Sequence, residues 1–486
     1  MTDLIFEGLR SLLNLPVLLA LVGGTAGGIV IGAIPGLTAT MAVALLIPVT
    51  FGMDPVVGLA MMGGVYSGGM YGGAISSILL STPGTPAAAA TAFDGYPMTK
   101  KGLGSQALAV ATVSSFWGGI ISTIALLFVA PSLARVALRF GPPEFFLLAI
   151  LGLTSIVTLT KGNLIKGLIS GVLGMLIAVV GMDPINGFIR FAGDTIELYE
   201  GIDFMPALIG LFSISQLFEL SSSTHIVQLE GQATFGRTKL PKGLSGTIAR
   251  GGLIGTLVGM LPGAGATIAS FISYNFAKTT DKDGDSFGKG NPKGVAAAES
   301  ANNGCVGGSL VPLLTLGIPG NSVAAALMGG LMIHNLIPGP ELFTRYGAVT
   351  YGFIISLFLA NIVFLILGLY FAPLFARVTT APNALLIPLI TVLSVIGSFA
   401  IKGSLFEVWL MLAFGVGGYF LKRMGFDVGA LVLGLILGPV AESGFGQALA
   451  ISGGDPSIFF TRPLCLVLWV CVVLLLLPAF IRKRKA

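Results

Sequence analysis

The sequence predicts an all-α polytopic membrane protein with roughly 10–14 membrane segments. Of its 486 residues, 54% are hydrophobic and only 10% are charged, whereas about a quarter of the residues in soluble domains carry a charge. Apolar runs such as 107–131, 349–372 and 463–481 are long enough to cross about 30 Å of hydrocarbon as helices. Strands of about ten residues with alternating hydrophobicity are missing, which favours a helical bundle over a β-barrel.

A glycine-rich motif with a Pro-Gly pair occurs twice in apolar sequence. Gly28 to Thr40 reads GIVIGAIPGLTAT, and Gly255 to Thr267, 227 residues later, reads GTLVGMLPGAGAT. A second echo follows, because YGGAISSILLSTPGTP at 71–86 is answered by VGGSLVPLLTLGIPGNS at 306–322 once one residue is inserted. Each half of the chain therefore contains two apolar segments that a Pro-Gly pair interrupts, and the sequence predicts two repeats.

The repeats meet at the longest polar interval of mid-chain. The predicted organisation is a first transmembrane repeat at 1–223, a polar linker at 224–250 and a second transmembrane repeat at 251–486.

The charges of matched loops indicate how the two repeats are oriented. The loop 182–203 contains five acidic residues and one arginine, whereas its counterpart contains Lys422 and Arg423. Because basic residues accumulate on the cytoplasmic side, one loop should face outward and the other inward. This favours inverted-topology repeats, the architecture of many secondary transporters, although Arg135 and Arg139 fit the scheme poorly.

The Pro-Gly pairs should interrupt the helices that contain them. Proline removes a backbone donor and clashes with the preceding turn, and glycine tolerates conformations closed to other residues. In lipid, the freed backbone groups are costly unless they line a cavity or contact protein. Four matched breaks therefore predict a shared polar cavity near the midplane, although small residues can also simply allow tight helix packing. The breaks are Pro35-Gly36, Pro83-Gly84, Pro262-Gly263 and Pro319-Gly320.

Small hydroxyl and amide residues flank these breaks and predict the ligands. A helix that restarts after a break presents unpaired N–H groups and a positive dipole end, which suit a carboxylate, while freed carbonyls suit a sodium ion. The predicted substrate-binding residues are Pro35, Gly36, Thr38, Thr40, Gly72, Ser81, Thr82, Pro83, Gly84, Thr85, Pro262, Gly263, Gly265, Thr267, Pro319, Gly320, Asn321 and Ser322.

A carboxylate and two amides precede the last break. Glu299 shares a helix face with Asn302 and Asn303 by its spacing. Their oxygens form a candidate cation site, with Na⁺ expected at Asn302 and Asn303, because an intramembrane carboxylate is a functional candidate by default. The alternative is that Glu299 lies at the membrane surface as a helix-end charge.

Other polar residues have simpler interpretations. Asp94, in FDGYP at 93–97, is expected to end a segment as part of a turn. The segment 278–293, with four lysines and three aspartates, is expected to be a solvated surface loop without the spacing of a phosphate loop. His334 could relay protons but is more often structural at a helix end, and Glu442 ends an apolar span. The three cysteines have no metal-binding spacing and are expected to be buried.

The net charge of +5 is spread over loops and the tail, which indicates topology signals and not nucleic-acid binding. The segment 482–485, RKRK, directly follows an apolar span and predicts a cytoplasmic C-terminus.

Several motifs occur together in one order along the chain. They are IPGLTAT at 34–40, TPGTP at 82–86, FDGYP at 93–97, LPGAG at 261–265, ESANN at 299–303 and LGIPG at 316–320. With these motifs the sequence resembles the large membrane subunit, the TctA type, of the tripartite tricarboxylate transporter family. Ser300 is a mild departure, since a small apolar residue is expected there.

The resemblance implies a bacterial inner-membrane transporter that an ion gradient drives. It implies two protein partners, a small four-helix membrane subunit of the TctB type and a periplasmic solute-binding protein of the TctC type. It also implies citrate-like di- and tricarboxylates as substrates, with no cofactor beyond a coupling cation, Na⁺ or H⁺. An elevator-like or rocking motion would expose the site to each side in turn.

Two rivals belong to other classes. A passive organic-anion channel would also use broken helices and backbone dipoles, but its pore usually contains rings of charged groups or carbonyls. A membrane enzyme would need a nucleophile with a base or a metal cluster, and with two isolated histidines the sequence predicts no enzyme.

Overall fold

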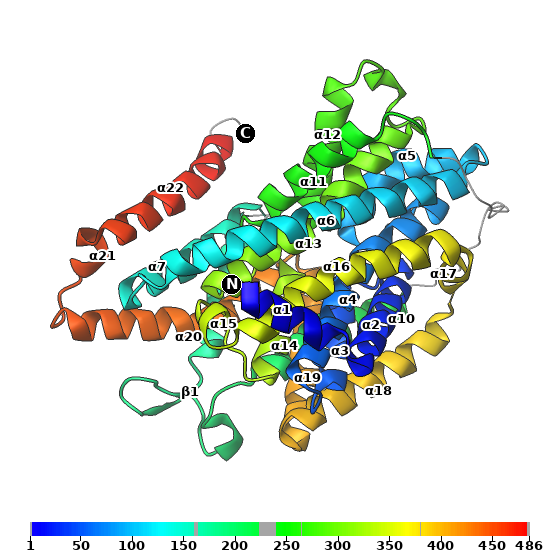
Figure 1. The fold of residues 1–486 in the computed structure, drawn as a ribbon. Helices are drawn as coiled ribbons and strands as arrows, with labels where there is room; N and C mark the ends of the chain where they lie inside the picture. Colours follow the sequence, from blue (N-terminus) through cyan, green and yellow to red (C-terminus); the bar gives the residue numbers. More distant parts are fainter. Residues whose placement is uncertain (1, 160–163, 223–239, 264, 380, 484–486) are drawn as a thin grey trace.

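Helices form nearly all of the regular structure (Figure 1). The computed structural model describes residues 2–159, 164–222, 240–263, 265–379 and 381–483. Within these ranges the only sheet is an antiparallel pair of two-residue strands, β1 (Gly181–Met182) and β2 (Ile189–Arg190). The predicted all-α fold class is therefore confirmed.

The helices follow one another with short connections. The first half contains α1 (Thr2–Leu12), α2 (Leu15–Ala33), α3 (Ala39–Leu46), α4 (Pro55–Leu80), α5 (Ala89–Lys100), α6 (Gly104–Ala137), α7 (Pro142–Leu159), α8 (Leu164–Ala178), α9 (Phe204–Ile209), the π-helical turn η4 (Gly210–Ile214) and α10 (Ser215–Ser222). The second half contains α11 (Ser245–Gly259), α12 (Gly265–Thr280), α13 (Pro292–Leu316), α14 (Ser322–Ile333), α15 (Glu341–Thr344), α16 (Gly347–Tyr370), α17 (Ala372–Val378), α18 (Asn383–Lys402), α19 (Leu405–Arg423), α20 (Val428–Ile451), α21 (Ile458–Thr461) and α22 (Pro463–Lys483). Short 3₁₀ turns are η1 (Pro48–Thr50), η2 (Pro86–Ala88), η3 (Ile196–Leu198) and η5 (Gly284–Ser286).

Seven helices of the described chain are long and apolar enough to cross a membrane, and five further apolar helices are shorter. The predicted runs at 107–131 and 463–481 fall in α6 and α22, and the run at 349–372 lies almost wholly in α16 and ends at the first residue of α17. Large apolar side chains cover the outer surface, as at Phe128, which is 61% exposed. An apolar outer surface is what a lipid environment requires, so the protein is a multi-pass membrane protein.

The predicted linker at 224–250 lies largely outside the described residues, which resume at 240. Its last part is helical, because α11 begins at Ser245.

Glycines let one pair of helices in each half pack backbone against backbone. A Cβ atom on Gly28 of α2 would lie 2.4 Å from the carbonyl oxygen of Val65 on α4. In the second half, a Cβ on Gly255 of α11 would lie 2.3 Å from the carbonyl oxygen of Ala301 on α13. These distances leave no room for a methyl group, so both helix pairs depend on glycine for their close approach.

The two halves also make equivalent contacts after these helices. The Gly84 N–H group donates to the carbonyl of Gly73 at 3.4 Å, and the Gly320 N–H group donates to the carbonyl of Ser309 at 3.4 Å. Both members of the second pair lie 236 residues after those of the first. In each half, the chain that leaves a long helix therefore folds back beside it before the next helix begins.

Asp94 joins the first half to the second. The prediction that it ends a segment in a turn is wrong, since Asp94 lies fully buried inside α5. Its Oδ1 atom accepts hydrogen bonds from the backbone N–H groups of Gly288, Gly290 and Asn291 at 2.7–2.9 Å. Its Oδ2 atom accepts from the Tyr274 hydroxyl at 2.8 Å. These long-range contacts, which sequence spacing cannot show, keep the chain helical through an Asp-Gly pair that locally favours a turn.

The segment 278–293 is solvated only in part. Phe287 is buried, and the backbone around it wraps the Asp94 carboxylate. An ion pair of 2.5 Å joins Lys293 to Asp281 at the outer end of the segment. The hydrogen bond from Lys293 lowers the pKa of Asp281 below its ordinary value. The expectation of a fully solvated loop is therefore corrected.

We expect Gly28→Ala and Gly255→Ala each to destabilise the protein by about 1–3 kcal/mol, because the added methyl group forces two helix backbones apart. The unfolding temperature of the purified protein in detergent measures the effect. Gly23→Ala in the same helix, α2, is the matched control, since its Cβ would meet nothing within 4 Å. Equal unfolding temperatures for all three variants would contradict the packing argument.

We expect Asp94→Ala to release the segment 281–291, because three backbone donors lose a charged acceptor whose hydrogen bonds contribute about 1.5–3 kcal/mol each. Trypsin should then cleave after Lys282 or Lys289 at least several-fold faster than in the parent protein. Asp285→Ala removes an exposed carboxylate of the same segment and is the control. Unchanged cleavage in Asp94→Ala would show that the segment does not depend on this carboxylate.

Candidate functional site

All four Pro-Gly pairs interrupt helices, as predicted. The first lies between α2 and α3, the second between α4 and α5, the third between α11 and α12, and the fourth between α13 and α14. Gly36 and Gly263 adopt φ values of +90° and +80°, which side-chain-bearing residues rarely adopt. Glycine is therefore needed at the first break and at the third break, where α2 and α11 end.

The breaks from the two halves contact one another. The Thr40 and Ser322 hydroxyl groups lie 3.0 Å apart, which joins the first break to the fourth. The Gly263 N–H group donates to the Gly320 carbonyl at 2.8 Å, which joins the third break to the fourth. Segments that are far apart in sequence thus meet at one place.

A cavity of about 630 Å³ opens where these segments meet. Its lining includes residues from every break. The predicted residues among them are Thr38, Thr40, Thr85, Gly263, Gly265, Thr267, Asn321 and Ser322.

Other predicted residues do not line this cavity. Ser81 and Thr82 are exposed outside it. Gly72 instead serves helix packing, since its Cβ would lie 2.5 Å from the carbonyl oxygen of Ile29. The remaining predicted residues of the breaks are not among those that line the cavity; they are Pro35, Gly36, Pro83, Gly84, Pro262, Pro319 and Gly320.

Four helices begin at the cavity wall. Thr38 caps α3 by accepting from the Met41 N–H group, and Asn321 caps α14 by accepting from the Ala324 N–H group. The first residues of α12 and α20 also line the cavity. Helix N-termini carry a positive partial charge and unpaired N–H groups, so this wall favours an anion.

Three polar side chains of the lining were missed by sequence reasoning. Gln216 belongs to α10, Lys422 to α19, and Asp427 caps α20. Lys422 was interpreted only as a topology charge, because nothing in its local sequence shows what its side chain contacts.

Glu299 lies inside the protein and not at a helix end. It is fully buried on α13, seven residues after the helix begins at Pro292, so the surface alternative is wrong. Its carboxylate accepts from the Thr91 hydroxyl, from the Ser115 hydroxyl at 3.0 Å and from the Asn302 amide at 3.3 Å. Hydrogen bonds from three donors stabilise a buried carboxylate group.

The side-chain amide groups of Asn302 and Asn303 donate hydrogen bonds, but their carbonyl oxygens accept none from the described residues. The Asn302 Nδ2 atom donates to the Met70 carbonyl at 3.0 Å, and the Asn303 Nδ2 atom donates to the Ser67 carbonyl at 3.3 Å. Both Oδ1 atoms are buried without a hydrogen-bond partner among the described residues, and so is the Ser67 hydroxyl. Such groups cost about 1–3 kcal/mol each unless a ligand satisfies them. A sodium ion is coordinated by oxygen ligands, so these residues fit this ion.

The remaining candidates have structural partners. His334 lies at the end of α14 with its Nε2 atom 3.2 Å from the Thr50 hydroxyl. Glu442 forms an ion pair of 2.5 Å with Arg190, which also pairs with Asp183 at 3.4 Å. Hydrogen bonds from the backbone of Ile185 and Asn186 lower the pKa of Asp183. Cys305 and Cys465 are buried, and Cys471 is partly buried.

A multi-pass helical protein whose interrupted helices surround a polar cavity has the build of a membrane transporter. Residues 18–433 match the tripartite tricarboxylate transporter TctA family, and the chain belongs to this family. The family is one of transporters, and its name describes a tripartite transporter, which implies further subunits.

Two similar proteins come from Agrobacterium vitis. One is described as an uncharacterized 52.8 kDa protein in the TAR-I ttuC' 3' region; it is 38% identical over 468 residues, which cover 95% of this chain and 93% of that protein. The other is described as an uncharacterized protein in the TAR-II ttuC' 3' region; it is 39% identical over 234 residues, which cover 47% of this chain and 97% of that protein. No solved structure matches the chain.

Proposed function

We propose that the protein is the large permease subunit of a tripartite, binding-protein-dependent transporter that uses an ion gradient to take up organic di- and tricarboxylates resembling citrate. The observation that carries this proposal is the cavity at which the N-termini of α3, α12, α14 and α20 meet. Together with the family match, it supports an anionic substrate.

The substrate would be held by backbone and hydroxyl groups. One carboxylate group fits the N-terminal N–H groups of α12 and α14, beside the hydroxyls of Thr40 and Ser322. Thr38, Thr85 and Thr267 supply further hydroxyl groups on the same wall. These neutral donors suit a site that must release its substrate, because they bind a carboxylate without a permanent counter-charge.

The coupling cation would bind behind the cavity. The free Oδ1 atoms of Asn302 and Asn303 lie on α13, which ends at the fourth break. A sodium ion there would hold α13 against Ser67 of α4, the helix that ends at the second break. The ion would thereby fix two segments that line the substrate cavity. Glu299 offers a route to proton coupling instead, since it is the buried carboxylate of this group.

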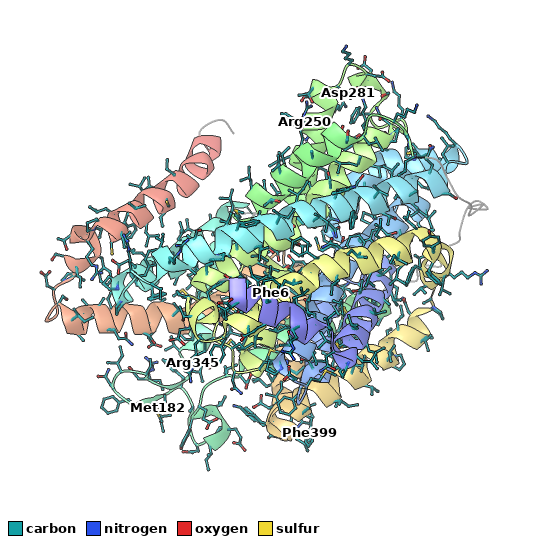
Figure 2. The ribbon with its side chains drawn as sticks, viewed as in Figure 1. Phe6, Met182, Arg250, Asp281, Arg345 and Phe399 are labelled. Carbon is teal, nitrogen blue, oxygen red and sulfur yellow. The ribbon has the colours of Figure 1, made fainter. Side chains whose placement is uncertain are left out.

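The two halves would form inverted repeats, 1–223 and 251–486, with the linker 224–250 between them. Lys402, just before α19, lies 3.6 Å from both Glu200 and Asp203, so α19 begins at the acidic loop. Its other end, near Lys422, lies about 28 Å further on at 1.5 Å per residue. The loop after α8 and the loop after α19 therefore lie at opposite ends, which supports the inversion. Figure 2 shows Met182 of the acidic loop and Phe399 near the end of α18 on the same lower side of the molecule.

The remaining parts of the proposal follow from the family. The partners would be a small four-helix membrane subunit of the TctB type and a periplasmic solute-binding protein of the TctC type. The site would be exposed to each side in turn by an elevator-like or rocking motion in the bacterial inner membrane, with a cytoplasmic C-terminus. No nucleic acid and no bound cofactor would take part.

Transport against a gradient distinguishes this proposal from a passive organic-anion channel. We expect vesicles that contain the complete transporter to accumulate labelled citrate or another carboxylate above the external concentration when an inward sodium or proton gradient is imposed. Collapsing both gradients should stop accumulation. Uptake that only equilibrates under every gradient would instead establish the channel.

The cation site has a direct test. We expect Asn303→Ala to raise the sodium concentration needed for half-maximal thermal stabilisation of the purified chain by about 10-fold or more, because a ligand oxygen is lost. Asn361→Ala, which removes a buried amide from α16, is the control for lost packing. Sodium stabilisation that is equal in the parent, Asn303→Ala and Asn302→Ala proteins would remove the assignment.

A further inference from the structure

The cavity has two chemically different walls. The wall formed by the four breaks contains hydroxyl groups, an amide and backbone N–H groups but no charged side chain. Another part of the lining contains Gln216 of α10 and Lys422 of α19, together with the turn that leads into α20. Of the described residues that line the cavity, Lys422 is the one with a cationic side chain.

The side chain of Lys422 makes only long, partly solvated polar contacts. Its Nζ atom donates to Gln216 Oε1 at 3.3 Å and lies 4.0 Å from Glu219 Oε1. The lysine side chain is 24% exposed and the glutamate side chain 39% exposed, so water screens this pair. A lysine on a flexible four-carbon stem can exchange such a partner for a stronger one.

The acidic residue of the lining does not neutralise Lys422. Asp427 Oδ1 accepts from the N–H groups of Gly429 and Ala430 at 2.8 and 3.2 Å. Its carboxylate is thereby bound to the N-terminus of α20, whose partial positive charge offsets it. No direct contact joins Asp427 to Lys422 among the ion pairs of the described residues.

We propose that Lys422 binds a second carboxylate group of the substrate and so selects dicarboxylates and tricarboxylates over monocarboxylates. This inference rests on the proposed function, in which the breaks bind the first carboxylate. A cavity of about 630 Å³ has room for a small organic acid, and both the residues of the breaks and Lys422 line it. The ammonium group then leaves Glu219 and pairs with the substrate, with Gln216 donating a further hydrogen bond.

The test compares ligands that differ in one charge. Citrate, succinate and glutarate are first screened for binding to the purified chain by isothermal titration in the presence of sodium. The tightest ligand is then compared with its monoamide, which replaces one carboxylate by a neutral group of the same size. Binding is measured for the parent protein and for Lys422→Met, Lys422→Arg and Arg423→Met. Arg423 is the matched control, because it is the neighbouring cation but is exposed outside the cavity lining.

We expect Lys422→Met to raise Kd for the full carboxylate by at least about 10-fold and to leave Kd for the monoamide within about 3-fold. Lys422→Arg should restore most of the affinity, and Arg423→Met should change neither value. An equal change for both ligands in Lys422→Met, or no change for either, would overturn the assignment of Lys422 and leave the proposed function standing. A parent protein that binds none of the three acids would overturn both. Unfolding temperatures of the variants separate loss of binding from loss of folding.

Discussion

The backbone groups that the four Pro-Gly pairs release inside an apolar protein constrain the rest of the structure. Unpaired N–H and carbonyl groups are costly in such surroundings, so the breaks have to satisfy one another. The Gly263 N–H group donates to the Gly320 carbonyl within the second half, and the contact between the Thr40 and Ser322 hydroxyls joins the first half to the second. The cavity exists because four interruptions are collected at one place, where the first residues of four helices line it.

Close helix packing makes this collection possible. In each half a helix that precedes a break crosses a longer helix at glycines, where no Cβ atom fits, as at Gly32 on α2 and Gly259 on α11. A Cβ on Gly84 would lie 2.1 Å from the Gly32 carbonyl oxygen, and a Cβ on Gly320 would lie 2.6 Å from that of Gly259. The glycine of one break thus rests on the end of the helix before the other break, so close packing at these glycines brings the breaks together.

Much of the fold and part of the site could be predicted, because they depend on local chemistry. A Pro-Gly pair within a long apolar run interrupts a helix, and such a run forms a helix of predictable length, so the positions of all four breaks followed from the residues. The grouping of Glu299 with Asn302 followed from helical spacing. Lys422 and Asp94 were interpreted wrongly or incompletely, because their partners, Gln216 and the backbone at 288–291, are distant in sequence. Ser81 and Thr82 adjoin a break but lie outside the cavity lining, since adjacency in sequence does not fix the direction in which a turn faces.

The position of Tyr66 and Ser67 gives a physical route by which cation and substrate could affect one another. Tyr66 Oη contacts Asn321 Nδ2 at 2.8 Å and Ser309 Oγ at 2.7 Å, and Asn321 both caps α14 and lines the cavity. The next residue, Ser67, accepts the Asn303 amide through its carbonyl. A cation at the proposed site, ordering Asn303 against Ser67, would therefore act on a residue whose neighbour contacts the cavity lining. Since α4 and α13 come from opposite halves, the same contact would also oppose separation of the halves. Such a coupling would need no long pathway, because one turn of α4 contacts both Asn303 and Asn321.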